Sequence, residues 1–310
     1  MKTSSPLAQL ILPLTLGLLL SSGNLAFAGN GKGGKPPKDD PPSNLPAIRY
    51  SIELVPIPDS ARIAPWEPRD INNLGMVVGN FTDNLDGSAR PFLYYSEQGA
   101  LHDLRLETDL SARLDVLKPG FRFSRLNAIN DAGVIVGLIY NPTTEIVRGI
   151  AIDTALNSDV ANWQLHLLPD FGPSWTEGGD VNIWGDVAGY YERADGTRDR
   201  FVVNPFTEPP EAGFVLGLAE GSLAPPVNIN DAKQIASHVY TTGPVEVYDA
   251  ATQPALLINR SELGRIHDNI AFNNAGQVVV VLVNQTEGRK GKRKDLLVQI
   301  DSYSGATETL

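Results

Sequence analysis

The 310-residue sequence contains no cysteine. Disulfide bonds, thiolate metal sites and a cysteine nucleophile are therefore excluded. Beyond residue 45 the chain also lacks apolar residues at helical spacing, whereas glycine (29) and proline (23) are frequent. A chain with few helix signals and many turn-forming residues is predicted to be all-β, with many short strands.

Basic residues are fewer than acidic ones: the sequence has 25 lysines and arginines and 36 aspartates and glutamates, which gives a formal net charge of −11. An acidic surface repels phosphate backbones, so we expect no nucleic-acid partner. The local exception is the basic run 289–294. It could hold an anionic polysaccharide or a lipid headgroup, but its glycines favour a solvated hairpin tip.

Long apolar runs are confined to the first 28 residues, which have the pattern of a secretory signal peptide. Lys2 provides the positive start, residues 7–20 are apolar, and Ala26-Phe27-Ala28 is a small-x-small cleavage site. An uncleaved membrane anchor is the alternative, but the run is short and contains Pro13. We expect a secreted bacterial protein, extracellular or periplasmic, with no membrane insertion after cleavage.

Glycine, lysine, proline and aspartate dominate residues 29–46. Such a segment cannot bury enough apolar surface to offset its ordering entropy, so we predict a disordered spacer. Residues 47–310 then form a single folded domain.

The folded domain repeats one short pattern five times. The repeats are centred on Asn72, Asn130, Asn182, Asn230 and Asn273, which are separated by 58, 52, 48 and 43 residues. In each repeat an apolar residue precedes the asparagine, a turn follows, and an apolar run rich in β-branched residues comes next. Asparagine at a strand end favours a turn because its side chain bonds to nearby backbone. The repeated unit is therefore predicted to be a β-hairpin.

Glycine stands three residues after the asparagine in four of the repeats, as expected where φ is positive. In that case Gly133→Val should cost about 1–3 kcal/mol, because a β-branched residue is strained there. The fourth repeat has Lys233 at this place. Its turn is predicted to be strained, so Lys233→Gly should be neutral or stabilising by up to about 1 kcal/mol.

Each repeat offers four strands, which in the second repeat are residues 125–130, 134–140, 147–153 and 163–168. Four antiparallel strands repeated at this period predict a β-propeller of five blades. We expect the N- and C-terminal strands to come together and close the ring. Residues 50–56 and 305–310 compete for the fourth place in the last blade, and we favour the former because it is longer and more apolar.

The pattern Asn-Asp-Ala-Gly-x-Ile/Val-Val-Gly, followed by an Asp-Gly turn and Arg-x-Phe/Ile, resembles the HAF-type "probable extracellular repeat" proteins of bacteria. The matching stretches are residues 130–137, residues 72–79 with 86–87 and 90–92, and residues 182–189 with 195–196 and 200–201. In the fourth repeat Lys233 and Ser237 replace both glycines, and in the fifth Val280 replaces the second. The resemblance covers residues 50–310 and implies an exported, propeller-like repeat protein with no known catalytic residues.

No residue is predicted to be catalytic, cofactor-binding or metal-ligating, and we expect no cofactor. The histidines have no metal-ligand spacing; they are His102, His166, His238 and His267. Residues 83–87 resemble a calcium loop but lack its distant glutamate, and Asp-Gly suits a hairpin turn for backbone reasons. Ser111, Ser124 and Ser174 lie in no nucleophile motif.

One pair of carboxylates keeps an enzymatic hypothesis open. Asp70 and Asp180 stand two residues before the asparagine in the first and third repeats. Some five-bladed propellers are glycosidases with carboxylates in a central funnel, and a glycosidase needs two carboxylates across the scissile bond. Four tryptophans could stack on sugar rings: Trp66, Trp163, Trp175 and Trp184. Aspartate at a strand end, however, commonly serves the turn.

Two functional hypotheses follow. The favoured one is a secreted, non-enzymatic propeller that binds an unknown protein or carbohydrate ligand, or forms part of a surface or matrix, as a monomer. The alternative is a secreted glycan-active hydrolase that uses Asp70 and Asp180. A funnel with converging carboxylates would favour the enzyme, and a plugged axis would favour the binding protein.

Overall fold

The structure of the protein is a computed structural model that describes residues 55–56, 61–207, 214–216, 227–238, 245–249, 256–258, 265–283, 295–301 and 307–309. Two units divide the chain, residues 1–54 and 55–310. The predicted signal peptide, the predicted spacer and the basic run 289–294 lie outside the described residues. Within the described ranges, no helix is long and apolar enough to cross a membrane.

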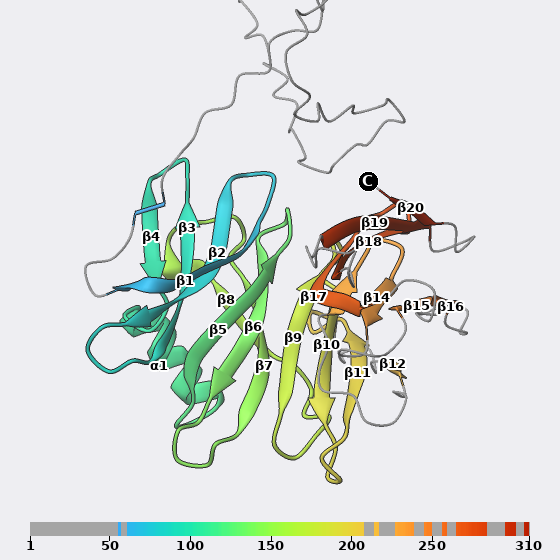
Figure 1. Cartoon of the computed structure of the whole chain (residues 1–310). Coiled ribbons are helices and arrows are strands. Elements are labelled where there is room, and N and C mark those ends of the chain that lie inside the picture. The colour runs from blue at the N-terminus through green and yellow to red at the C-terminus, as the bar shows by residue number, and fades with distance from the viewer. Residues whose placement is uncertain are drawn as a thin grey trace, which may run out of the picture. The chain divides into compact units, whose positions relative to one another are not determined.

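Five antiparallel sheets of four strands make up the described part of the chain, and in each sheet the strands follow sequence order (Figure 1). Sheet one contains β1 (Ala61–Ile71), β2 (Met76–Asp83), β3 (Ala89–Tyr95) and β4 (Ala100–Asp103); sheet two contains β5 (Arg122–Ile129), β6 (Val134–Tyr140), β7 (Val147–Asp153) and β8 (Gln164–Leu167). Sheet three contains β9 (Thr176–Val181), β10 (Val187–Glu192), β11 (Arg198–Val203) and β12 (Phe214–Leu216). Sheet four contains β13 (Val227–Ile229), β14 (Gln234–His238), β15 (Val245–Asp249) and β16 (Leu256–Ile258); sheet five contains β17 (Arg265–Phe272), β18 (Gln277–Val283), β19 (Asp295–Asp301) and β20 (Thr307–Thr309). The predicted all-β class is confirmed, and each repeat supplies one sheet.

A helix that the sequence pattern did not predict lies between β4 and β5. This helix, α1 (Thr108–Leu117), buries only Leu110 and Leu114, which are one turn apart. Two apolar residues give too short a periodicity to identify a helix from sequence. A single 3-10 turn, Val160–Asn162, precedes β8.

Sheets pack on one another through both faces, which explains the continuous apolar runs after each turn. On β6, Ile135 and Ile139 belong to a buried cluster shared with sheet one and α1. Val134 and Val136 belong to another cluster, shared with sheet three. Successive side chains of a strand point to opposite faces, so a strand between two packed layers needs apolar residues at every position.

The first strands of consecutive sheets contact one another, β1 with β5, β5 with β9, β9 with β13, and β13 with β17. Each asparagine turn connects such a first strand to the second strand of its own sheet. Neighbouring sheets therefore bring their asparagine turns together.

The fourth place in sheet five is held by β20, which pairs with β19 through Val298↔Thr309 and Ile300↔Thr307. The preference for residues 50–56 in that place is therefore wrong; of these, 50–54 lie outside the described residues. The physical reason is proximity in sequence. A strand that follows β19 after a short connection closes a small loop, whereas residues 50–56 would have to pair across the length of the domain.

Candidate functional site: the asparagine turns

The five asparagine turns share one backbone geometry. At Asn130 the side-chain Oδ1 accepts hydrogen bonds from the backbone N–H groups of Ala132 (3.0 Å) and Val134 (2.9 Å). The other asparagines bond in the same way. Three residues after the asparagine, φ is positive at Gly75 (74°), Gly133 (81°), Gly185 (81°), Gly276 (76°) and Lys233 (59°). The predicted positive-φ turn is confirmed, including the strained lysine.

A further bond from the asparagine side chain joins each turn to the next. The amide Nδ2 donates to the backbone carbonyl of the following asparagine: Asn72 to Asn130 (3.1 Å), Asn130 to Asn182 (2.7 Å), Asn182 to Asn230 (3.3 Å) and Asn230 to Asn273 (3.3 Å). We call this row the asparagine ladder. An aspartate could organise the same turn but has no N–H to donate. The consistent choice of asparagine over aspartate was the sequence signal for this second role.

A parallel row of bonds uses the residue after each asparagine. The Asp131 carboxylate accepts from the backbone N–H and the side-chain amide of Asn73 (2.8 and 2.6 Å). The Asp231 carboxylate accepts from the backbone N–H of Ile183 (3.1 Å) and the side-chain amide of Asn274 (2.6 Å). Between Asp131 and Ile183 this polar row is interrupted, because isoleucine has no polar side-chain group. The third turn is thus the apolar member of a polar row.

Asp70 and Asp180, the pair of the enzymatic hypothesis, connect neighbouring sheets. Each carboxylate accepts from the backbone N–H of the next residue (2.8 Å). Each also accepts from the first strand of the following sheet, Asp70 from Ile129 and Asp180 from Ile229 (both 2.9 Å). Both carboxylates are therefore occupied by backbone donors, as an aspartate that serves the structure would be.

Electrostatics nevertheless distinguish these two carboxyl groups from ordinary ones. Burial raises the pKa of Asp70, and the charge of Asp131 adds to the effect. Burial also raises the pKa of Asp180 to about 7, with a smaller contribution from the charge of Asp70. The backbone hydrogen bonds act in the opposite direction but do not outweigh the loss of solvation.

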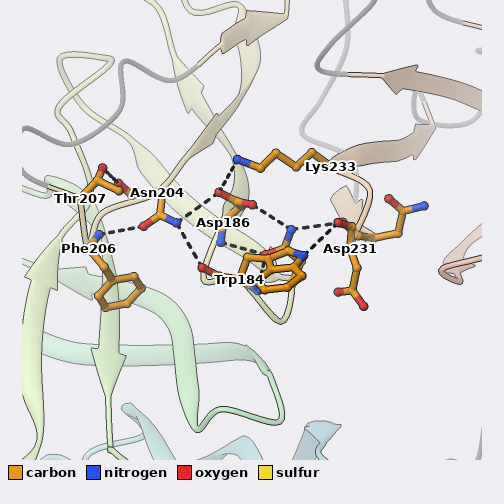
Figure 2. A network of polar contacts seen from close by, with 9 residues as sticks. Trp184, Asp186, Asn204, Phe206, Thr207, Asp231 and Lys233 are labelled. Atoms are coloured by element: carbon orange, nitrogen blue, oxygen red, sulfur yellow. Dashed lines mark hydrogen bonds and ion pairs between the residues drawn. The ribbon is translucent and has the colours of Figure 1, made fainter.

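The third turn has a buried polar network of its own, which Figure 2 shows. Four residues after the asparagine the others have Met76, Val134, Gln234 and Gln277, whereas the third has Asp186, which is 1% exposed. The Asp186 carboxylate accepts from the amides of Asn182 (3.0 Å) and Asn204 (3.2 Å). It also lies 3.1 Å from the ammonium group of Lys233. The lysine that replaces glycine in the fourth turn is therefore the counter-ion of the aspartate in the third.

Trp184 lies on the outer side of this network. Its indole N–H donates to the backbone carbonyl of Asp231 (3.2 Å), as Figure 2 shows. The side chain is nevertheless 68% exposed, and the neighbouring Ile183 is 37% exposed. Three of the other turns have alanine at the position of Trp184, and the first has Leu74. A tryptophan held in one orientation presents a large apolar surface at little entropic cost, which is typical of binding hot spots.

A polar cluster at the start of β9 was not apparent from the sequence. Glu177 is 4% exposed, and its carboxylate accepts from Asn127 Nδ2 (2.8 Å), Trp175 Nε1 (3.2 Å) and the Tyr190 hydroxyl. The Arg198 guanidinium lies over the rings of Trp175 (5.5 Å) and Tyr190 (5.6 Å). Burial and the charge of Glu177 raise the pKa of Tyr190. Three donors satisfy the carboxylate, so the cluster connects β5 and β9 and leaves no open site.

The histidines with described side chains pack against aromatic rings. His102 bonds to Glu107 (2.8 Å) and meets the rings of Tyr95 and Trp163 edge-on. His166 meets the ring of Phe206. The side chains of His238, His267 and Trp66 lie outside the described part of the chain. Trp163 is fully buried, which gives it a packing role.

The loop 83–87, which resembles a calcium loop in sequence, is ordered by its own aspartate. Asp83 is fully buried, accepts from the backbone N–H of Leu85 (2.6 Å) and forms an ion pair with Arg90. Among the described residues, no group of three His, Cys, Asp or Glu side chains could hold a metal ion. The arrangement is that of a hairpin turn.

Comparisons with known proteins do not give a family. No protein-family model matches the chain, and no curated protein matches it. Solved structures that resemble it include TolB from Acinetobacter baumannii, with 13% identity and a TM-score of 0.45. That match covers 79% of this chain and 54% of the TolB chain. A puromycin-hydrolyzing peptidase of Mycobacterium tuberculosis (12%, TM-score 0.39) is matched over 42% of its chain and 76% of this one. The tricorn protease (11% identity, TM-score 0.39) is matched over 25% of its chain and 76% of this one.

The chain spans about half the length of the TolB structure. Each of these TM-scores is below 0.5, so the arrangement of the sheets rests on the strand pairing and the contacts of this chain.

Proposed function

We propose that the protein is an exported, non-enzymatic binding protein whose five sheets close into a five-bladed β-propeller. Export is supported by the pattern of residues 1–28 and predicts a mature N-terminus at Gly29, which N-terminal sequencing checks. The ligand is a protein or a carbohydrate that binds at the third asparagine turn.

Closure of the ring is supported by the face of sheet one that points away from sheet two. Phe81 and Phe92 on this face are each 1% exposed, and within the described residues their cluster contains Tyr94 with the partly buried Val55, Val77 and Leu101. Val279 in β18 has the same place in its repeat as Val136 in β6, which faces the following sheet. Small-angle scattering on residues 47–310 tests closure, because a compact ring should have a radius of gyration of about 18 Å. A clearly larger value would indicate an open arc.

The binding surface is defined by Ile183 and Trp184, and one observation carries the assignment. The third turn breaks the polar row at Ile183 and exposes a fixed tryptophan where three other turns have alanine. Neither exposed side chain adds to the core. Places where a repeat departs from its own local rule without a stabilising gain are expected at functional sites.

The experiment screens the mature chain on a glycan array and against a displayed peptide library, then titrates the best binder. Trp184→Ala should weaken binding at least tenfold, because a hot-spot tryptophan contributes about 2 kcal/mol or more. Leu85→Ala is the matched control, since Leu85 is also a turn residue and is 90% exposed. A ligand that binds both variants equally well would place the binding surface elsewhere.

A glycan-active hydrolase is the second candidate, favoured by the Asp180 carboxyl group. Burial and the charge of Asp70 raise its pKa to about 7, which is in the range of a general acid that works near neutral pH. Release of reducing sugar from the arrayed glycans tests this activity. Our proposal expects no release. Release that both Asp70→Asn and Asp180→Asn abolish would replace it with the hydrolase.

A further inference from the structure

Among the residues that the structure describes, no strand pairs with the outer edge of sheet two. β8 is the outermost strand and pairs with β7 on one side. The backbone N–H of Leu168 donates to the carbonyl of Gly149 (3.0 Å). In an antiparallel ladder successive residues point their backbone groups alternately toward and away from the partner strand. Leu165 and Leu167 therefore direct their N–H and C=O groups to the free edge.

A groove of about 480 Å³ adjoins this edge. Helix α1 contributes Ala112, Arg113, Val116 and Leu117 to it, and β8 contributes residues 164–166. Val116 is 84% exposed and Leu117 45%. Successive side chains of a strand point to opposite faces of the sheet. Three consecutive residues of β8 line the groove, so the groove lies at the edge of β8 and not on one face of the sheet.

The Arg113 side chain already donates hydrogen bonds to backbone carbonyls near this edge. Its guanidinium donates to the backbone carbonyls of Val160 and Trp163. Trp163 is two residues before Leu165, so its carbonyl belongs to the same outward-facing set. The arginine thus takes the place of a donor on an incoming strand. Its partners within the described residues are carbonyls and no carboxylate, so its positive charge remains for an occupant of the groove.

We propose that this groove binds an extended peptide segment of a partner protein, which adds to β8 as a fifth strand. The peptide backbone pairs with Leu165 and Leu167, its alternate apolar side chains lie against Val116 and Leu117, and an acidic residue at one end meets Arg113. Strand addition with pockets for alternate side chains is an established mode of peptide recognition. The site is separate from the third asparagine turn and does not depend on the ligand proposed there.

The probe is a fluorescein-labelled peptide, Asp-Val-Thr-Val-Lys-Val-amide, titrated with the mature chain by fluorescence anisotropy. Val116→Glu should weaken binding at least tenfold, because it places a charge in the apolar wall. Leu106→Glu is the matched control, since Leu106 is 65% exposed and outside the groove. Both positions face solvent, and far-UV circular dichroism checks that both variants are folded. Equal binding by the two variants overturns the proposal.

A second readout separates strand addition from ordinary apolar binding. Two peptides carry backbone N-methyl groups at the odd or at the even positions. Only alternate amides of an added strand face β8, so one peptide should lose binding at least tenfold and the other should retain it. Loss with both peptides or with neither contradicts strand addition, as does a dissociation constant above about 1 mM for the unmodified probe. If a peptide of residues 50–56 binds more tightly than the probe, the occupant of the groove is a segment of this chain. The proposal of a partner protein would then be overturned.

Discussion

The second and third asparagine turns have the same backbone but opposite surroundings. Both hold glycine at a φ of 81°, and both donate to the next turn through the asparagine ladder. Outside the second turn is Ala132, and beneath it Val134 packs in the core. Outside the third turn is the exposed Trp184, and beneath it Asp186 is buried. The asparagine bonds and the positive φ three residues later are the same in both turns, so the remaining positions can diverge.

The divergence of the third turn is compensated in the fourth. A buried carboxylate needs a cation or several donors, and Lys233 of the fourth turn supplies the cation. The strained φ of that lysine is therefore tolerated because its side chain reaches Asp186. A residue that departs from the repeat pattern therefore has to be interpreted together with the neighbouring sheet. Comparison of the second and third turns and their surroundings leads to four predictions.

The largest effect is expected at the glycine of the second turn. A Cβ atom on Gly133 would lie 2.6 Å from Thr154 Oγ1 and 2.7 Å from Leu156 Cδ2. Steric overlap therefore adds to the strain of a positive φ, and Gly133→Val should cost about 3–5 kcal/mol, more than the sequence alone predicts. A Cβ atom on Gly185 would lie 3.0 Å from the Phe206 ring and 4.0 Å from Asn204 Nδ2, so Gly185→Val should cost about 2–3 kcal/mol.

Gly196→Val is the control for that pair. Gly196 has the same φ of 81°, and a Cβ atom there would meet no atom within 4 Å, so the substitution reports backbone strain alone, about 1–2 kcal/mol. Urea melts of the three variants should give the order 133, 185, 196. Equal costs would mean that steric overlap contributes nothing and that the second turn is no more tightly packed than the third.

The second prediction reverses the sign expected from the sequence. Lys233→Gly relieves a φ of 59° but removes the cation beside the buried Asp186. Relief is worth up to about 1 kcal/mol. Asp186 keeps its amide donors Asn182 and Asn204 but loses its cation. This loss costs more than the relief, even after allowing for a lysine side chain that is 44% exposed. Lys233→Gly should therefore destabilise the protein by about 1–2 kcal/mol in a denaturant melt.

A double-mutant cycle sharpens this result. In an Asp186→Val background the third turn resembles the second, and Lys233→Gly should then be neutral or stabilising by up to about 1 kcal/mol. The coupling energy between the two positions should exceed about 1 kcal/mol. Additive effects would show that the ion pair does not explain why lysine replaces glycine.

The third prediction concerns pH. The pKa of Asp180 is raised from 3.8 to about 7 in the folded chain, so the folded state holds the proton more tightly than the unfolded state. This stabilisation is complete below pH 3.8 and is lost as the pH rises through about 7. Between pH 5 and pH 8 the unfolding free energy should fall by about 1–2 kcal/mol, allowing for solvent screening. Asp180→Asn should remove this fall, and an unchanged pH profile would rule out Asp180 as its source.

The sequence predicted local features of these turns well and their partners poorly. The strands β6 and β7 have the predicted bounds because their apolar runs end at turn residues. Positive φ was predictable, since glycine recurs at one place. The asparagine ladder was not, because its bonds join residues 43 to 58 positions apart and depend on how the sheets pack.

The same limit applies to the candidate sites. Lys233 and Asp186 each appear in sequence as isolated exceptions, and only their distance of 3.1 Å relates them. Trp184 was recognisable as a turn residue, but its 68% exposure and its bond to the Asp231 carbonyl of the next turn follow from how the turns pack. The α1–β8 groove joins segments about 50 residues apart, as the Arg113–Trp163 bond shows. Local sequence patterns do not predict such a contact.

The smallest predicted effect restores the polar row that the third turn interrupts. Between the fourth and fifth turns, Asn274 accepts from the backbone N–H of Asp231 (2.9 Å) and donates to its carboxylate (2.6 Å). Asp131 and Ile183 hold the corresponding positions between the second and third turns. Ile183→Asn can therefore form the same two bonds with Asp131 and should stabilise the protein by about 0.5–1 kcal/mol, because exposed hydrogen bonds are worth little each.

That gain should come with a loss of binding if Ile183 belongs to the ligand surface. A substitution that stabilises the fold and weakens function is the usual sign that a residue is retained for function. The measurement is a urea melt together with a titration of the ligand identified in the array or library screen. Destabilisation by Ile183→Asn would instead show that the isoleucine supports the third turn itself. The contrast with the second turn would then be a matter of packing, and Trp184 would have to define the binding surface alone.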